Sequence, residues 1–448
     1  MNTENFWSAN RLTIKGCIVA CLILVMLVPT LFIMNLISER AQRQEEVTTE
    51  VNSKWAGAQT ISGPLLVIPY HETTKNNEGK IIVLKKYAYF LPERLTINGE
   101  LLPEIRHRSI FNIVVYRTDI KLEGEFVPLQ PETLSIRRED MQLAESYICF
   151  GLSDFRGIED QMSIRWNDSN YVFNAGVPDN SIISNGLNAT VALTDKDLDQ
   201  VNAFSIQLRL RGSENLSFIP VGKTTNVHFS SAWQNPSFDG SFLPVATPEV
   251  NSSGFNADWK VQHLNRNYPQ SWKDEKFNVH DSRFGITLLQ PVDSYAKTMR
   301  SVKYGILFIA LTFGLYFFIE ILQKKTVHPV QYVLVGIALC IFYTLLLSIS
   351  EYLRFNIAYA IAATSTIMLI SFYTKSLFHK WKIAALFGVM LTLLYSFIFI
   401  LIQLQDGALL FGSIGLFILL SIVMYYSRKI DWYGQQGKTN YSIDVHQV

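Results

Sequence analysis

The hydrophobic positions of this chain follow two different patterns, and the change between them falls near residues 40 and 300. Residues 40–300 resemble a polar globular protein, whereas both flanks carry long apolar runs. The hydrocarbon core of a bilayer, about 30 Å thick, requires about 20 apolar residues of helix. Backbone groups inside lipid must also be satisfied within their own segment. The pattern therefore predicts six membrane-spanning helices, at residues 16–37, 304–322, 331–349, 355–373, 383–402 and 408–426.

The first apolar run is too long for a cleaved signal peptide, and no small-residue cleavage site follows it. The chain instead continues into Ser38, Glu39 and Arg40. We interpret this run as a retained signal anchor. Pro29 is expected to kink the helix, which we expect to continue through about Lys54.

The central segment shows hydrophobic alternation at a period of two. In residues 203–210, Phe204, Ile206, Leu208 and Leu210 share one face. Turn signals such as Asn98-Gly99 separate several such runs, a pattern typical of a sandwich of short antiparallel strands. The predicted fold class is a membrane α+β protein: an N-terminal transmembrane helix, a large antiparallel, sandwich-like β-rich domain at 38–303, and a five-helix transmembrane bundle at 304–426.

Positive charges in the short loops predict the orientation. Lys15 precedes the first helix, and further lysines and arginines follow the second, fourth and sixth helices. With six crossings these clusters all fall on one side, which is cytoplasmic by the positive-inside rule. Residues 1–15 and the tail 427–448 are therefore expected in the cytoplasm, and residues 38–303 outside it. Tyrosines near the predicted helix ends, including Tyr316, Tyr332 and Tyr352, are interpreted as an interfacial belt.

Composition and motifs exclude some classes of function but identify none. A formal net charge of +1 gives no electrostatic argument for nucleic acid as a partner. Cys149 is the one cysteine of the polar segment, so we expect its core, and no disulfide, to hold that domain. Motifs of nucleotide-binding loops, zinc proteases and serine hydrolases are missing from the sequence. We therefore expect no catalytic residue, no cofactor and no metal. The long apolar runs make membrane lipids the first expected partners.

Ionisable residues at the apolar helices are the strongest candidates for a functional site, because charge inside a membrane is costly. Glu320 lies near the end of the second helix, and His328 opens the third. One interpretation is an ion pair between Glu320 and Lys324, four residues later. The other is a contact between Glu320 and His328 that fixes the hairpin.

At the opposite ends of the helices lie Glu351, Arg354 and Asp406. Glu351 and Arg354 are three residues apart, so a local salt bridge is the simpler interpretation. The sharper hypothesis brings all three together beneath the outer domain, where they gate or dock it. The sequence contains no chain of carboxylates across the bilayer, which argues against an ion-coupled transporter.

Short motifs are distributed in order along nearly the whole chain, among them Ser153-Asp-Phe-Arg-Gly-Ile158, Leu208-Arg-Leu-Arg-Gly-Ser213, Pro236-Ser-Phe-Asp-Gly-Ser-Phe-Leu-Pro244, His328-Pro-Val-Gln-Tyr-Val-Leu-Val-Gly336, Leu346-Leu-Ser-Ile-Ser-Glu351 and Asp431-Trp-Tyr433. Together they resemble the CreD family of bacterial inner-membrane proteins. The sequence departs from the family pattern at Asn235, at Tyr352 and Arg354, and at Gln405. If those positions carry proton chemistry in the family, this member has lost part of it.

The resemblance implies an inner-membrane location, a periplasmic domain at 38–303 and a role in cell-envelope integrity under stress. Our working hypothesis is a non-enzymatic protein whose periplasmic domain binds an envelope protein or another envelope ligand. One alternative is a transporter or lipid-handling protein that uses a polar cavity among the helices. A second is an enzyme acting on an envelope substrate, which requires a pocket with converging polar groups.

Overall fold

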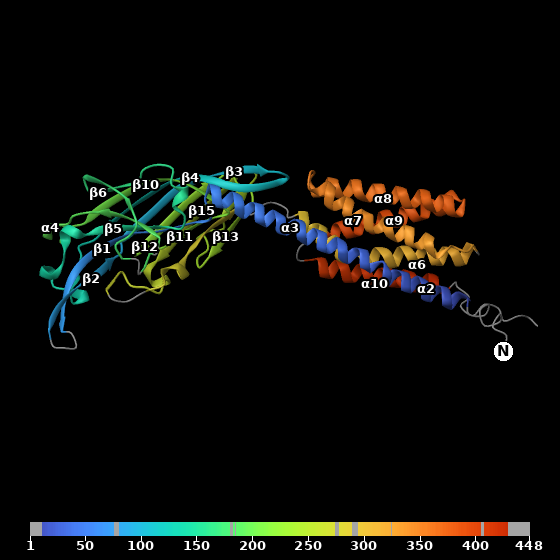
Figure 1. Cartoon of the computed structure of the whole chain (residues 1–448), viewed down its shortest axis with the longest axis horizontal. Helices are drawn as coiled ribbons and strands as arrows, with labels where there is room; N and C mark the ends of the chain where they lie inside the picture. Colours follow the sequence, from blue (N-terminus) through green and yellow to red (C-terminus); the bar gives the residue numbers. More distant parts are fainter. Residues whose placement is uncertain are drawn as a thin grey trace, which may run out of the picture. The chain divides into compact units, whose positions relative to one another are not determined.

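In the computed structural model, residues 11–75, 80–179, 182–183, 185–273, 277–288, 294–323, 325–404 and 407–428 are described. The chain divides into two compact units. We call Glu45–Pro291 the β unit, and Met1–Gln44 with Val292–Val448 the helical unit. The fold class is as predicted: an apolar N-terminal helix, a β-rich middle and apolar C-terminal helices (Figure 1).

The β unit contains two sheets. The nine-stranded sheet comprises β1 (Gln59–Lys75), β2 (Ile81–Phe90), β5 (Tyr147–Leu152), β8 (Asn174–Ala175), β9 (Gly186–Thr190), β11 (Asn215–Ile219), β13 (Pro236–Gly240), β16 (Ser271–Lys273) and β17 (Phe284–Leu288). The eight-stranded sheet comprises β3 (Arg94–Arg108), β4 (Phe111–Phe126), β6 (Ser163–Trp166), β7 (Ser169–Val172), β10 (Asn202–Ser213), β12 (Thr224–Ser231), β14 (Glu249–Asn251) and β15 (Gly254–Gln262).

The strand order departs from the predicted antiparallel arrangement in two places. The nine-stranded sheet runs β13-β17-β11-β1-β5-β9-β8, with β2 on β1 and β16 on β2. The other runs β14-β15-β12-β3-β4-β10-β6-β7. Two pairings are parallel, β1 with β11 and β3 with β12, and the remaining pairings between named strands are antiparallel. The alternation of side chains specifies which face is buried, but it does not specify the direction of a neighbour distant in sequence.

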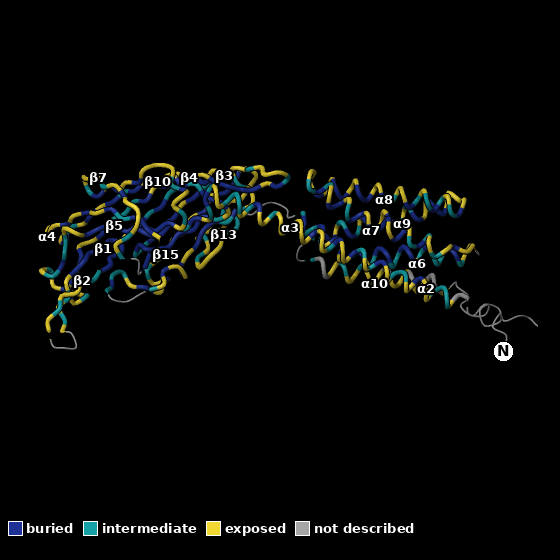
Figure 2. The backbone as a smooth tube through the Cα atoms, in the orientation of Figure 1, coloured by how far each residue is buried: buried dark blue, intermediate teal, exposed yellow. Residues whose placement is uncertain are grey.

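One hydrophobic core lies between the two sheets. The predicted face of β10 is buried there, since Phe204, Ile206, Leu208 and Leu210 are at most 4% exposed. Figure 2 shows buried stretches, in dark blue, along strands of this unit. Aromatic pairs join the sheets: the ring centroids of Phe218 on β11 and Phe229 on β12 are 5.0 Å apart. Cys149 is buried in this core and is not bonded to another cysteine.

Two helices cover the first apolar run, α2 (Arg11–Val25) and α3 (Leu27–Trp55). The helical pattern is interrupted at Met26, three residues before Pro29. Proline has no N–H to donate to the carbonyl four residues earlier, here Val25, and its ring crowds the preceding turn. The break therefore falls one turn before the proline itself. Helix α3 reaches Trp55, close to the predicted end.

The C-terminal helices are α6 (Gly305–Gln323), α7 (Pro329–Ser350), α8 (Phe355–Phe378), α9 (Trp381–Gln403) and α10 (Ala408–Ser427), which cover the predicted ranges. Among the described residues, five helical stretches are long and apolar enough to cross a membrane: Thr13–Trp55 and α6 to α9. The apolar stretch of α10, Leu410–Ile422, is shorter. The sixth crossing therefore stays a prediction.

One helix was not predicted. Residues 294–303 were assigned to the β-rich domain, but they form α5 (Ser294–Lys303), which belongs to the helical unit. Its buried residues, Tyr295, Thr298, Ser301 and Val302, recur at helical spacing and contact α6, α7 and α9. Ten residues are too few for a sequence pattern to separate a helix clearly from two short strands. The domain boundary near 303 was therefore placed too late.

Candidate functional site

Glu320 on α6 joins three segments of the helical unit. Its carboxylate forms an ion pair with Lys15 on α2 and is only 6% exposed. Oε1 also accepts a hydrogen bond from the backbone N–H of Val327, at 2.9 Å, and Oε2 accepts one from the Tyr332 hydroxyl, at 3.0 Å. A buried charge is tolerated when it is paired and hydrogen-bonded, and both conditions hold here.

The sequence pattern predicted two other partners for Glu320, namely Lys324 and His328. Lys324 lies outside the described residues. The expected contact with His328 is wrong, because this histidine caps α7 instead. The His328 ring Nδ1 accepts a hydrogen bond from the backbone N–H of Val330, at 3.3 Å. The backbone N–H of His328 donates to Gln331 Oε1, at 2.9 Å. Capping satisfies backbone donors that the first helical turn leaves unpaired.

Glu351 lies at the C-terminal end of α7 and also bridges separate segments. Its Oε1 accepts a hydrogen bond from the Tyr295 hydroxyl of α5, at 3.1 Å, and lies 3.9 Å from Nε of Arg40 on α3. The predicted salt bridge with Arg354 is wrong. Helix α7 ends at Ser350, so the helical spacing assumed for Glu351 and Arg354 does not apply, and Arg354 is an exposed N-cap of α8.

Asp406 lies outside the described residues, so its predicted convergence with Glu351 stays a prediction. Near it in sequence, Gln403 of α9 accepts a hydrogen bond from Lys297 Nζ, at 2.9 Å, and donates to Asn356 Oδ1, at 2.6 Å. Partial burial and the neighbouring Arg300 lower the pKa of Lys297. We call Arg40, Tyr295, Lys297, Glu351, Asn356 and Gln403 the α5 network.

Aromatic side chains fill the interior between α6, α7, α8 and α9. The rings of Tyr316 and Phe387 have centroids 4.3 Å apart, and those of Phe308 and Tyr395 are 4.4 Å apart. Tyr316 and Tyr332 are 1% and 2% exposed, so their assignment to an interfacial belt was wrong. Tyr352, 75% exposed, lies at a helix end as expected. Among the described residues, these rings therefore pack closely against one another between the helices.

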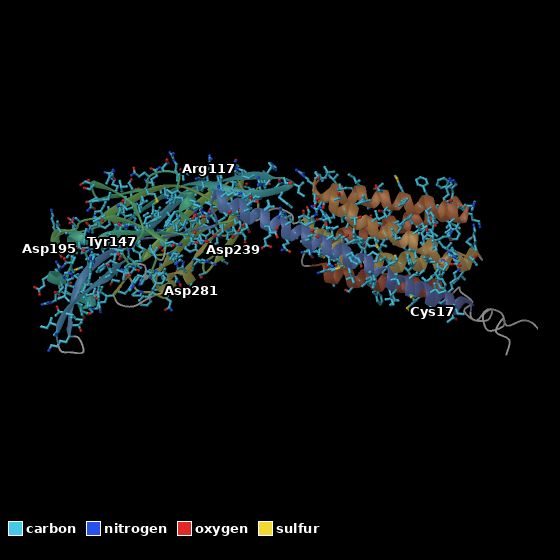
Figure 3. All side chains as sticks on the ribbon, in the orientation of Figure 1. Cys17, Arg117, Tyr147, Asp195, Asp239 and Asp281 are labelled. Atoms are coloured by element: carbon cyan, nitrogen blue, oxygen red, sulfur yellow. The ribbon has the colours of Figure 1, made fainter. Side chains whose placement is uncertain are left out.

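In the β unit, three arginine side chains surround Trp55 at the end of α3. The guanidinium carbons of Arg106, Arg211 and Arg117 lie 4.5, 5.0 and 5.6 Å from its ring centroid. Arg117, labelled on the outer surface in Figure 3, and Arg211 both pair with Glu159. Since Glu159 offsets two of these charges and the cations lie over the indole ring, this cluster fixes the end of α3.

The turn after Trp55 is held by Asp154. Its Oδ2 accepts from the N–H of Gly57, at 2.9 Å, and from Arg156 Nη2, at 2.7 Å. The hydrogen bonds from Arg156, together with the backbone N–H groups, lower the pKa of Asp154 to about 2. Within the described part of the chain, no group of three His, Cys, Asp or Glu side chains is arranged to hold a metal ion.

An apolar N-terminal helix, a β-rich unit and a set of apolar helices define a multi-pass integral membrane protein. A sequence model of the family described as "Inner membrane protein CreD" matches residues 11–433. The chain is also 31% identical over 417 residues to the inner membrane protein CreD of Escherichia coli (strain K12), covering 92% of this chain and 91% of that protein. It belongs to the CreD family, as the motifs predicted, and is an inner-membrane protein.

Proposed function

We propose that this protein contributes to the integrity of the cell envelope by binding an envelope component through its β unit, while the helical unit anchors it. The observation that carries this proposal is the set of contacts that the candidate carboxylates make with other helices. Glu320 and Glu351 are each engaged in holding helices together. A carboxylate engaged in this way contributes to the association of helices, and the described aromatic rings of the same unit pack closely against one another.

The proposed orientation has both termini in the cytoplasm and the β unit in the periplasm. It is supported by the positive charges at one set of helix ends, which include Lys15, Lys325, Lys375 and Lys380. The β unit itself has a core that needs no disulfide, so either redox environment suits it. We infer no catalytic role, since the sequence contains no recognisable catalytic motif.

The second candidate function is lipid handling, which one feature of the helical unit favours. A crevice of about 340 Å³ lies between α2 and the start of α7, with Ile18, Val19 and Leu22 on its apolar wall. Lys15 and His328 lie on the same crevice. Apolar side chains beside basic groups suit an acyl chain and an anionic headgroup.

One set of strains separates the two candidates. A null strain is complemented with the wild-type chain, Glu320→Gln, Glu351→Gln, or Ile18→Trp, which fills the crevice. Leu24→Trp, on an exposed position of the same helix outside the crevice, is the matched control. Immunoblots establish equal abundance, and uptake of a hydrophobic fluorescent dye measures the envelope barrier.

We expect both glutamine variants and Ile18→Trp to restore the barrier, because the proposed function resides in the β unit. Failure of the glutamine variants at normal abundance would contradict the anchor role and favour chemistry among the helices. Failure of Ile18→Trp alone, with Leu24→Trp functional, would replace the proposal with lipid handling.

A further inference from the structure

The β unit contains a cavity of about 350 Å³ that the proposed function has not used. Its wall combines amide side chains, Asn265, Asn267 and Asn278, with the rings of Phe242 and Phe277. Amides offer both donors and acceptors, while aromatic faces cover the apolar parts of a small molecule. The lining therefore suits a polar organic ligand better than an acyl chain.

Arg266 lines this cavity and is only 8% exposed. Its guanidinium stacks on the ring of Tyr268, with 4.1 Å between Cζ and the ring centroid. Nη1 donates to the carbonyl oxygens of Tyr268 and Pro269, and Nη2 donates to Gln270 Oε1. The Nε–H is buried without an acceptor. Every one of these partners is neutral.

A buried arginine ordinarily has a carboxylate partner, because a lone charge loses its hydration without compensation. Across the described residues, no Asp or Glu lies within ion-pair distance of Arg266. Burial lowers the pKa of Arg266 to about 10, so the side chain still carries its charge at neutral pH. Among the described residues, the guanidinium on this cavity wall therefore has only neutral hydrogen-bond partners, an arrangement that suits a bound anion.

Asp281 lies on the same wall and is labelled in Figure 3. Its Oδ1 accepts from Asn278 Nδ2, at 2.8 Å, rather than from Arg266. A carboxylate on the wall repels a ligand with two negative charges more than a ligand with one. The cavity therefore favours a monoanion, such as a carboxylate, over a phosphate dianion.

We propose that this cavity binds a small molecule whose carboxylate pairs with Arg266 and whose polar skeleton contacts the asparagine side chains and the two phenylalanine rings. This inference rests on the proposed function, since it names the ligand class of the β unit. Two envelope sources share this chemistry: a sugar acid, and the carboxyl terminus of a short peptide.

The test uses the full-length protein in lipid nanodiscs and ligand-detected NMR titration. The probes are N-acetylmuramic acid and N-acetyl-D-alanyl-D-alanine, each a monoanion at neutral pH and each compared with its own uncharged amide. The variants are Arg266→Gln and Asn267→Asp. Asn267 is exposed on the cavity wall and its side chain forms no hydrogen bond with another described residue, so its replacement by Asp adds a negative charge and removes no contact seen among those residues. Asn170→Asp, on exposed β7, is the matched control.

We expect at least one acid to bind the wild-type protein and the Asn170→Asp variant, while its amide binds about tenfold more weakly or less. Asn267→Asp should weaken binding by about tenfold or more through like-charge repulsion. Arg266→Gln should abolish binding, and its thermal unfolding curve establishes whether the variant is folded. If Arg266→Gln is unfolded, Asn267→Asp decides the result.

Binding of N-acetylmuramic acid alone would assign a sugar acid, and binding of the dipeptide alone a peptide carboxylate. Equal binding of acids and amides, or equal binding by Asn267→Asp and Asn170→Asp, would overturn the carboxylate site. Failure of both acids to bind the wild-type protein would overturn it as well. The dye-uptake result with the helix variants does not depend on this cavity, so failure there would count against the proposed function alone.

Discussion

Strand β10 and helix α7 each bury one regular face, but the exposed face of β10 is polar and that of α7 is mostly apolar. On β10, Gln207 and Arg209 point away from the core. On α7, the exposed positions recur every three or four residues, and from Val330 to Leu345 they are apolar: Val330, Leu334, Ile337, Ile341 and Leu345. Ser348, in the last turn, is the exposed polar residue of this helix. The first face suits water and the second suits lipid. Burial alone does not distinguish these elements, but the chemistry of the exposed side does.

The difference extends to what holds each unit together. The β unit gains stability by removing aliphatic and aromatic side chains from water. Lipid gives helices no comparable gain, so their association depends on close packing and on polar contacts between helices. The ion pair of Glu320 with Lys15, the α5 network and the tightly packed tyrosines of the helical unit meet that requirement.

The largest expected effect comes from placing the same charge on each exposed face. Ile341 and Val172 are 45% and 46% exposed, on α7 and on edge strand β7 respectively. Ile341→Lys should cost about 2.5–3.5 kcal/mol, because lysine at the centre of a membrane helix loses its hydration. Val172→Lys should change stability by about 0.5 kcal/mol or less, since charge suits a water-exposed edge. Thermal unfolding in nanodiscs measures both, and equal losses would refute the assignment of the two faces.

A smaller effect concerns acid stability of the β unit. The pKa of Asp154 is lowered to about 2 in the folded protein, below its ordinary value of 3.8. A lowered pKa stabilises the fold above the ordinary value, and this contribution is lost as the pH falls from about 4 towards 2, in total about 2 kcal/mol. Unfolding of wild type and Asp154→Asn should therefore differ at pH 6 and converge near pH 2. A constant difference across that range would exclude this ionisation as the cause.

The smallest expected effect tests the ion pair of the helical unit. Lys15 is 23% exposed, so solvent screens part of its attraction to Glu320. We expect Glu320→Gln and Lys15→Met to couple by about 1 kcal/mol in a double-mutant cycle. Thermal unfolding of the two single variants and the double variant supplies this coupling. Additive losses would mean that Glu320 acts through Val327 and Tyr332 alone.

Local patterns predicted the elements well. The buried face of β10 and the helical ranges follow from periods of two and from long apolar runs, which depend on neighbouring residues only. Helix α5 was missed because ten residues carry too little pattern. The parallel pairings of β1 with β11 and β3 with β12 join strands far apart in the chain, and a local pattern contains no information about such partners.

In the candidate site too, local patterns identified residues but not their partners from distant parts of the sequence. Glu320 stood out because a carboxylate near a membrane helix end is unusual, and the structure buries it. Its partner Lys15 lies 305 residues away, so no local spacing indicated it. Glu351 was assigned to Arg354 because helical spacing was assumed beyond the end of α7. Arg40 and Tyr295, its actual partners, come from α3 and from the helix that was missed.

The distance between Lys15 and Glu320 in the sequence has a consequence for the order of synthesis. The ribosome completes α2 long before it adds the glutamate 305 residues later. At about 5–20 residues per second, the interval is about 15–60 seconds. During this interval Lys15 has been synthesised and its partner Glu320 has not. The ion pair can therefore form only after α6 is made, so a late segment of the chain stabilises the position of an early one.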